Sequence, residues 1–256
     1  MGAAGATLFA SDQHLSPVRP GALRAFHAFA AGPAREAAAV YLLGDLFDAW
    51  AGDEQLRDPF VADVVKSLRS ISDAGVPLYI AHGNRDFLLG DRFAQATGAT
   101  LLPEVQVLDL HGVRTLICHG DHLCTEDVEY QNYRARMRSD EAKARLLGLP
   151  YFVRRFIAWY LRRRSRSDKA LKPESIMDVT PAAVSDAFRQ HDAARMIHGH
   201  THRPARHRHD VDGTMRERIV LADWHEHGQY VAVDAAGVAD HAIADDPAKA
   251  QALTAP

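Results

Sequence analysis

The sequence has little cysteine and no long apolar run, and these absences narrow the classes of protein it can belong to. Cys118 and Cys124 are its two cysteines among 256 residues, which excludes a disulfide framework. No apolar segment approaches the roughly 18 residues of a membrane-spanning helix. The first residues contain no basic segment followed by a long apolar stretch, so we expect a cytoplasmic protein. A net charge of −3 gives no overall attraction to nucleic acid, and neither a nucleic-acid partner nor an obligate protein partner is expected.

What the sequence does contain is a set of five polar motifs, each directly after an apolar, strand-like run. The runs are TLFAS, AVYLL, VPLYIA, RTLIC and ARMI. The motifs that follow them are Asp12-Gln13-His14, Gly44-Asp45-Leu46-Phe47-Asp48, Gly83-Asn84-Arg85-Asp86, His119-Gly120-Asp121 and Gly199-His200-Thr201-His202. The carboxyl ends of parallel strands border the crevice where open α/β sheets bind ligands. Oxygen and nitrogen donors gathered there indicate a site for two divalent metal ions, which is suited to attack of water on phosphorus.

The spacing and type of the donors predict how they bind the metals. Residues i and i+2 of a strand point to the same face, so Asp12 can reach an ion together with His14, and His200 together with His202. Glycines beside the donors allow sharp turns and close backbone approach. Carboxylate, imidazole and amide donors together suit Mn²⁺ or a similar ion, whereas structural zinc would favour thiolates. We therefore expect two divalent ions as cofactors, with Mn²⁺ favoured.

The ordered motifs D-x-H, GDxxD, GN-x-D, HGD and GHTH resemble those of the calcineurin-like metallophosphoesterase superfamily. Longer stretches are similar to the family within it that hydrolyses UDP-2,3-diacylglucosamine in lipid A biosynthesis; they are YLLGDLFDAW, HGNRDFLLG, HGDHLCTEDVEYQ, SIMDVTPAAV and IHGHTHRPA. The resemblance runs from about Thr7 to about Val233. It implies metal-dependent attack of water on the α-phosphorus, which gives UMP and 2,3-diacylglucosamine 1-phosphate.

The resemblance also assigns roles to residues. One metal would be held by Asp12, His14 and His202, the other by Asn84, His119 and His200, and Asp45 would bridge them. The implied catalytic set is Asp45, Asn84 and Arg85, and the implied substrate contacts are Asn84, Arg85, Asp127, Ser165, Lys169, Lys172 and His200. Asp48 and Asp121 are expected to contact metal ligands on the side away from the metals and thereby to orient them. His198 is not expected to bind metal, and the histidines expected at the surface are His207, His209, His225 and His227.

Arg85 is a departure from the wider superfamily, in which many phosphoesterases have histidine after the Gly-Asn pair as a proton donor to a leaving alkoxide. Arginine does not donate a proton at neutral pH, but it binds phosphate oxygens in a bidentate way. A phosphate monoester that leaves in place of an alkoxide is already a stable anion, so it needs no proton donor. Arg85 therefore favours a diphosphate substrate, and the family that the sequence resembles also has arginine here.

The alternation of apolar runs and helical patterns predicts an α/β fold. We expect helices over Gly21–Ala31, Gln55–Ala74, Asp91–Thr97 and Ala182–His191, a hairpin of Val105–Leu110 and Arg114–Cys118, and late strands at Ile219–Ala222 and Tyr230–Val233. The tail after Ala244 is expected to fray. Together with the resemblance, this pattern predicts a single metallophosphoesterase domain over residues 1–256, a β sandwich flanked by helices, with a helical cap inserted at 123–180.

The cap segment differs from the rest of the sequence in charge. Between Leu123 and Lys172 there are 13 Lys and Arg residues against 6 Asp and Glu, a local balance of +7 that leaves −10 for the remainder. Apolar residues alternate with arginines 154, 155, 162, 163 and 164. The segment is either a helical insertion with a solvated basic face or a cap that lines an acyl chamber with Leu149, Phe152, Val153, Phe156, Ile157 and Tyr160. In the second case the arginines are expected to face anionic lipid and hold the enzyme peripherally at the cytoplasmic face of the inner membrane.

Three functions remain open from the sequence. The first is hydrolysis of the acylated UDP-glucosamine substrate. The second is a different two-metal phosphoesterase that acts on a soluble nucleotide or a phosphoprotein, which Arg85 and the apolar insertion disfavour. The third is a binding module that kept the fold without catalysis, which an intact set of seven metal donors disfavours.

Overall fold

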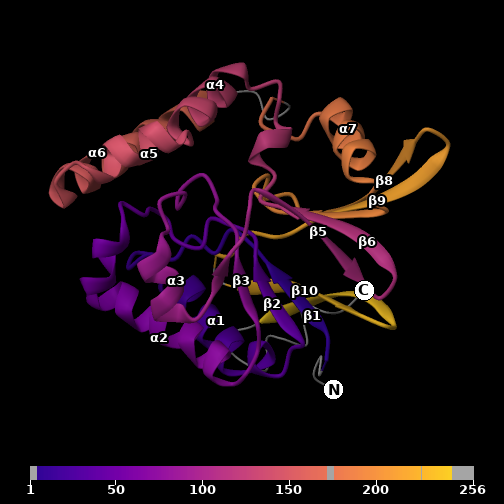
Figure 1. The fold of residues 1–256 in the computed structure, drawn as a ribbon, viewed down its shortest axis with the longest axis horizontal. Coiled ribbons are helices and arrows are strands. Elements are labelled where there is room, and N and C mark those ends of the chain that lie inside the picture. The colour runs from indigo at the N-terminus through magenta and orange to yellow at the C-terminus, as the bar shows by residue number, and fades with distance from the viewer. Residues whose placement is uncertain (1–4, 172–175, 226, 244–256) are drawn as a thin grey trace.

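Two β-sheets pack face to face at the centre of the computed structural model, which describes residues 5–171, 176–225 and 227–243, and only the backbone of 164–171 (Figure 1). The six-stranded sheet has the order β11-β10-β1-β2-β3-β4, with bounds Gly237–Ile243, Gly228–Asp234, Thr7–Ala10, Ala39–Leu42, Leu78–Ile80 and Thr100–Leu101. The five-stranded sheet has the order β5-β6-β7-β9-β8, with bounds Val105–Leu110, Val113–Cys118, Arg195–His198, Thr214–Val220 and Ala205–Val211. This arrangement confirms the predicted β sandwich.

Strand direction brings the predicted motifs to one end of the sandwich. β1, β2 and β3 run parallel in one sheet, and β6, β7 and β9 run parallel in the other. The five motifs follow β1, β2, β3, β6 and β7, so all of them leave the sheets at carboxyl ends of parallel strands. The prediction that parallel strand ends build the site is therefore confirmed at the level of topology.

Three apolar layers hold the sheets and helices together. Phe9, Ile117 and Ile197 belong to the layer between the two sheets. On the outer side of the six-stranded sheet lie α1 (Pro20–Ala31), α2 (Pro59–Asp73) and α3 (Asp91–Thr97), with the short 3₁₀ turns Pro33–Arg35 and Asp53–Arg57. On the outer side of the five-stranded sheet lies α7 (Pro181–His191). Both sheets are thus covered on both faces in their central part.

Local sequence explains where these elements begin and turn. Helix α2 starts later than the predicted Gln55, because Asp58 accepts a hydrogen bond from the Phe60 amide and Pro59 follows as the first helical residue. The predicted hairpin of β5 and β6 is confirmed. Its turn residues His111 and Gly112 both have positive φ, 55° and 81°, as a two-residue hairpin turn requires.

Three strands were not predicted: β4, β8 and β11. Each of the three lies at a sheet edge and pairs with one neighbouring strand. In β8, whose sequence is ARHRHDV, four of the seven residues are exposed to solvent. Such edge strands need no apolar face, which is why the pattern gave no signal. The predicted strand Ile219–Ala222 overlaps the end of a longer strand, β9, which stops at Val220, and the tail after Ala244 lies outside the described residues.

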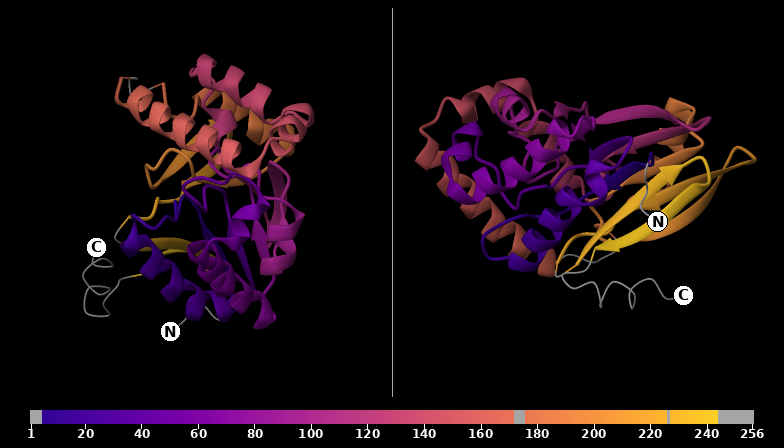
Figure 2. Two further views of the ribbon diagram at one scale, coloured as in Figure 1. Left: turned by 90° about the vertical axis from the view of Figure 1, so that its left-hand side faces the viewer. Right: turned by 90° about the horizontal axis from the view of Figure 1, so that it is seen from below.

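Between β6 and α7 the chain forms the helical insertion, comprising the 3₁₀ turn Asp121–Leu123, α4 (Val128–Met137), α5 (Asp140–Leu147) and α6 (Tyr151–Leu171). Figure 1 and the left view of Figure 2 show α4, α5 and α6 lying together on the side of the molecule opposite α1 and α2. Of the ten large apolar side chains that are exposed among the described residues, eight belong to this insertion. The insertion is therefore the part of the described chain with the most uncovered apolar surface.

Candidate metal centre and substrate site

Three predicted donors meet at the first candidate metal position. The His202 Nε2 atom lies 3.2 Å from the Asp12 Oδ1 atom and 3.2 Å from the His14 Nε2 atom, and the His14 Nε2 atom lies 3.8 Å from the same Asp12 oxygen. Asp12 and His14 are buried. Donor atoms of all three residues lie within 4.8 Å of one another. A carboxylate with two imidazoles at such distances fits a divalent cation of the Mn²⁺ or Zn²⁺ type.

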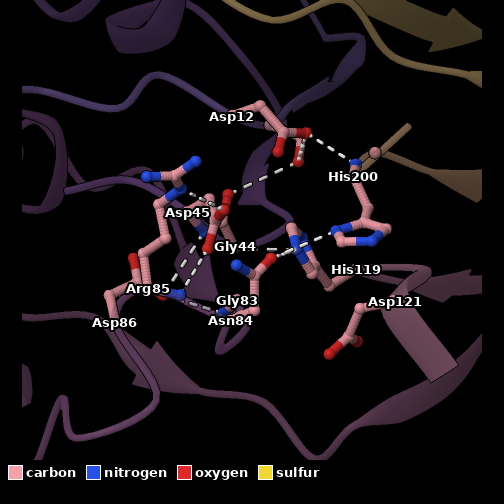
Figure 3. Close-up of polar contacts among 12 residues, drawn as sticks. Asp12, Gly44, Asp45, Gly83, Asn84, Arg85, Asp86, His119, Asp121 and His200 are labelled. Carbon is pink, nitrogen blue, oxygen red and sulfur yellow. Dashed lines mark hydrogen bonds and ion pairs between the residues drawn. The ribbon is translucent and has the colours of Figure 1, made fainter. Parts of the chain in front are cut away.

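A second set of donors gathers around Asn84, as Figure 3 shows. Its side-chain oxygen lies 3.2 Å from His119 Nε2 and 3.1 Å from His200 Nδ1. His119 is fixed by its other ring nitrogen, which lies 2.8 Å from the Leu43 carbonyl oxygen and donates to it. That bond directs the His119 Nε2 lone pair toward Asn84, the geometry in which a histidine ligand is held by a backbone carbonyl behind it.

Asp45 lies between the two sets. Its Oδ2 atom is 3.8 Å from His14 Nδ1, and its Oδ1 atom is 3.9 Å from His119 Nε2. Each carboxylate oxygen thus faces a different group of donors, as a bridging ligand must. Asp12, Asp45 and His119 also have donor atoms within 4.8 Å of one another, so one cluster contains members of both sets.

The backbone conformation that brings these donors together differs from the prediction. Asp12, His14, Asp45, His200 and His202 all have positive φ, between 47° and 70°. They lie beyond the ends of β1, β2 and β7, not within them. The prediction that neighbouring donors converge because they alternate along a strand was therefore wrong in its reason. They converge because each loop turns through the left-handed region, a conformation that costs free energy and often occurs at functional sites.

Two glycines show why the loops approach so closely. A Cβ atom on Gly44, whose φ is 92°, would lie 2.7 Å from the Gly83 amide nitrogen and 2.8 Å from the His119 ring. A Cβ atom on Gly83 would overlap the Asp45 carboxylate. The predicted close approach of backbone at these glycines is confirmed.

The charges of the site follow from burial and pairing. Burial lowers the pKa of His14 well below its usual value and keeps this imidazole neutral, which is the form that binds metal. Burial also opposes protonation of His202, but its hydrogen bonds to Asp12 and Asp223 outweigh that effect and raise its pKa to about 9. Burial alone would raise the pKa of Asp12, but the hydrogen bond with His202 and the neighbouring imidazoles hold that pKa well below the usual range. The carboxylates therefore favour positive charge at this position, which a metal cation supplies.

Two carboxylates that received no predicted role support the site. Asp86 is fully buried and accepts hydrogen bonds from the amides of Gly83 (2.7 Å) and Leu46 (2.7 Å), so it joins the second and third motif loops. Asp223 follows β9 and its Oδ2 atom lies 3.2 Å from His202 Nδ1, on the side of the ring opposite Asp12. A sequence signal existed for Asp223, because it follows the apolar run IVLA as the other motifs follow theirs.

In the described part of the chain, the Asp121 carboxylate binds groups of the insertion and the Asp48 carboxylate pairs with arginines, so their expected role in orienting metal ligands stays a prediction. Asp121 Oδ2 accepts hydrogen bonds from Tyr130 Oη (2.8 Å) and Arg134 Nε (2.9 Å) of α4 and from Arg138 (2.8 Å), the residue that directly follows that helix. Figure 3 shows it apart from the other labelled side chains. It reaches the site through Tyr130, whose ring stacks on His200 at 6.0 Å between centroids. Asp121 therefore anchors the insertion to the metal loops.

The structure describes some of the predicted substrate contacts, and others lie outside the described residues. The Arg85 side chain lies beside the metal donors, with Nε 3.4 Å from Asp45 Oδ2 and one terminal nitrogen 3.5 Å from Asp48 Oδ1. Asp127 caps α4 by accepting a hydrogen bond from the Tyr130 amide at 3.0 Å. The side chains of Ser165 and Lys169 and the whole of Lys172 lie outside the described residues.

The remaining predicted histidines have mixed outcomes. His198 is fully buried; its Nδ1 atom lies 2.9 Å from the Gly199 carbonyl and its Nε2 atom 3.1 Å from Arg218, so both ring nitrogens have protein partners. His225 is exposed, as expected. His207 and His209 are half-buried on one side of β8, with His209 against Arg218, and His227 is also half-buried, so the surface prediction was wrong for these three. His207 and His209 face residues of β9, which the sequence pattern did not place beside them.

The chain is similar to one protein family, to curated proteins and to solved structures. The calcineurin-like phosphoesterase family matches residues 6–204. The UDP-2,3-diacylglucosamine hydrolase of Escherichia fergusonii is 46% identical over 230 residues, 90% of this chain and 95% of that protein. The protein of the same name from Cellvibrio japonicus is 46% identical over 91% of this chain and 97% of its own length. Among solved structures, Vacuolar Protein Sorting 29 from Cryptosporidium parvum has 13% identity and a TM-score of 0.48, covering 93% of this chain and 90% of its own.

Proposed function

The chain belongs to the calcineurin-like phosphoesterase family, and we propose that it cleaves the diphosphate bond of UDP-2,3-diacylglucosamine in lipid A biosynthesis. It is a metal-dependent hydrolase, and its products on this substrate are UMP and 2,3-diacylglucosamine 1-phosphate. The observation that carries the proposal is the position of Arg85 beside the two donor sets, in a chain 46% identical to hydrolases of that name.

The metal-binding roles that we propose follow the observed clusters. Asp12, His14 and His202 hold one divalent ion, Asn84, His119 and His200 hold the other, and Asp45 contacts both. When bound, the two ions polarise the diphosphate and lower the pKa of water. We favour Mn²⁺, because three oxygen donors, from two carboxylates and one amide, are mixed with four imidazole nitrogens.

The protein's own groups then position the substrate. The Arg85 amide donates to Asp45 Oδ1 at 2.8 Å, which fixes the start of the side chain. Among the described carboxylates, the Arg85 guanidinium contacts Asp45 and Asp48 only at the long distances of 3.4 and 3.5 Å. Contacts of this length are weak hydrogen bonds at best. The guanidinium is thus held near the reacting phosphorus yet remains able to bind phosphate oxygens in a bidentate way.

Product analysis in ¹⁸O-labelled water tests the reaction. We expect UMP and 2,3-diacylglucosamine 1-phosphate in equal amounts, with the label in UMP, because water attacks the phosphorus that carries uridine. UDP-glucosamine without acyl chains serves as control and should react more slowly. Release of UDP, label in the lipid phosphate, or equal rates on the two substrates would favour a different phosphoesterase.

The orientation of α6 corrects our expectation for the acyl chamber and the membrane. Arg154 is buried and Arg162 is mostly buried against the core, so neither faces lipid as predicted. Successive helix residues are rotated by about 100°. The opposite face therefore carries an exposed stripe, in which Phe152 is 74%, Phe156 63% and Trp159 53% exposed. These aromatic side chains cannot also line an enclosed chamber. The half-buried flank of Val153, Ile157 and Leu161 is the part of α6 that we assign to the acyl chains.

We propose that this aromatic stripe rests on an anionic membrane surface. Arg155 and Arg163 are exposed on the same face, and Arg163 lies over the Trp159 ring at 5.8 Å. No acidic residue occurs between Pro150 and Arg163. Aromatic rings flanked by arginine suit the headgroup layer. Among the described helices, none is long and apolar enough to span a bilayer.

Vesicle sedimentation tests this surface. The protein should bind phosphatidylglycerol vesicles and lose affinity steeply with salt, since each arginine near an anionic surface contributes about 1 kcal/mol. Replacing Phe156 and Trp159 together by serine should weaken binding roughly tenfold or more, because each buried aromatic contributes about 1.5–3 kcal/mol. Met215→Ser is the matched control, since Met215 is 58% exposed on the β8–β9 hairpin. Equal losses in the control and the double variant would contradict the docking surface.

A further inference from the structure

Two arginines of α6 dock on the segment that follows the Asp45 loop. Arg154 is 4% exposed, donates to the Ala51 carbonyl at 2.7 Å, and pairs with Glu54. A Cβ atom on Gly52 would overlap the Arg154 guanidinium, so the segment is shaped to receive it. Eight residues further along α6, Arg162 pairs with the Asp48 carboxylate and also donates to the Asp48 carbonyl. Helix α6 therefore sits on residues 48–54 through two buried or nearly buried guanidinium groups.

Asp48 connects this seat to the substrate site. The same oxygen, Oδ1, pairs with Arg162 and lies 3.5 Å from a terminal nitrogen of Arg85. The side chains of Asp48, Arg162 and Arg85 are only 10%, 14% and 17% exposed, so solvent screens their interaction little. One carboxylate oxygen thus pairs with the guanidinium of Arg162 from the insertion and lies within 3.5 Å of the guanidinium of Arg85 from the metal-site loop.

We propose that Asp48 is a positioning residue that ties the orientation of Arg85 to the seating of α6. Its shared oxygen sets where the Arg85 fork lies relative to the Asp45 carboxylate, 3.4 Å from Arg85 Nε. When the insertion is seated, Arg162 binds the same Asp48 oxygen, so that the carboxylate orients Arg85 through a long contact and leaves its guanidinium able to bind phosphate. When the insertion lifts, Asp48 binds Arg85 alone. A substrate whose lipid part settles the insertion thereby places the arginine that binds its diphosphate. This inference rests on the proposed function.

A set of combined substitutions tests the connection. Asp48→Asn removes the shared charge and leaves the Asp48 carbonyl to accept from Arg162, and Arg162→Gln removes the other end. On UDP-2,3-diacylglucosamine each substitution should lower kcat about tenfold. The kcat of the double variant should be no more than about twofold below that of the less active single variant. In the Arg85→Ala background, Asp48→Asn should change kcat less than about twofold, because the residue through which it acts is gone. Asp48→Glu should recover most of the activity.

Controls separate positioning from folding and from a failed function. Arg145→Gln removes an exposed arginine of the same insertion, for which no contact to the site exists among the described residues, and should leave kcat unchanged. A tenfold loss from Asp48→Asn that persists in the Arg85→Ala background would overturn the inference, as would independent, multiplying effects of Asp48→Asn and Arg162→Gln. Absence of cleavage by the unaltered enzyme would instead overturn the proposed function. Thermal melts followed by circular dichroism identify variants that lose activity because they unfold. If Asp48→Asn unfolds, the activity of Asp48→Glu, which keeps the carboxylate, tests the inference instead.

Discussion

Asp45→Ala should abolish nearly all activity and leave the fold intact. Each oxygen of this carboxylate faces a different donor set, at 3.8 Å from His14 and 3.9 Å from His119. Its loss therefore weakens both metal positions at once, and we expect kcat to fall at least about a thousandfold, since metal activation of water and phosphate supplies much of the rate in such enzymes. The metal content, measured by mass spectrometry after gel filtration, should fall below the two ions per chain expected for the unaltered enzyme.

Stability should change far less than activity. Asp45 is 2% exposed and lies near the buried Asp86, whose pKa burial and the Asp45 charge raise to about 7. Removing Asp45 relieves that repulsion and offsets part of the lost hydrogen bond from the Arg85 amide. We expect the melting temperature to move by no more than about 4 °C. Asp73→Ala, which removes an exposed carboxylate from the end of α2, is the matched control for activity. Full activity of enzyme from which a chelator has removed the metal would contradict the two-metal assignment.

The five motifs allowed the site to be predicted because its chemistry is local to strand ends. An apolar run followed by Asp, Asn or His is visible in the sequence, and parallel strands bring such ends together. The backbone that completes the convergence was not visible. Positive φ at Asp12 or His202 costs free energy locally and is maintained by distant contacts, such as the Asp12 amide to the Gly44 carbonyl at 3.0 Å.

The orientation of α6 could not be predicted for a similar reason. Its arginines and its apolar residues alternate around the whole helix, so periodicity alone does not choose an inner face. The choice is made by Asp48 and Glu54, carboxylates about a hundred residues away in the sequence. Burial of Arg154 is favourable only because those partners and the Ala51 carbonyl satisfy it.

Arg85→Ala should lower kcat/KM on the diphosphate substrate by about a hundredfold, because one preoriented donor to the reacting phosphate is typically worth that much. The kcat/KM of Arg85→Lys should fall between those of the unaltered enzyme and Arg85→Ala, since lysine keeps the charge but loses the bidentate fork. The backbone contact from residue 85 to Asp45 remains in both variants, so the metal donors stay in place. Arg69→Ala removes an exposed arginine from α2 and should have no effect.

Arg85→His distinguishes a phosphate-binding role from a proton-donating one. Histidine restores the group that protonates a leaving alkoxide, so this variant should gain activity on an aryl or alkyl phosphodiester that the unaltered enzyme cleaves poorly, whereas Arg85→Ala should not. The diphosphate reaction needs no such proton, because its leaving group is a phosphate monoester anion. Arg85→His should therefore remain well below the unaltered enzyme on UDP-2,3-diacylglucosamine. If Arg85→Ala cleaves that substrate at the normal rate, Arg85 does not bind the diphosphate, and the reason for preferring this substrate over a soluble nucleotide would have to come from the insertion alone.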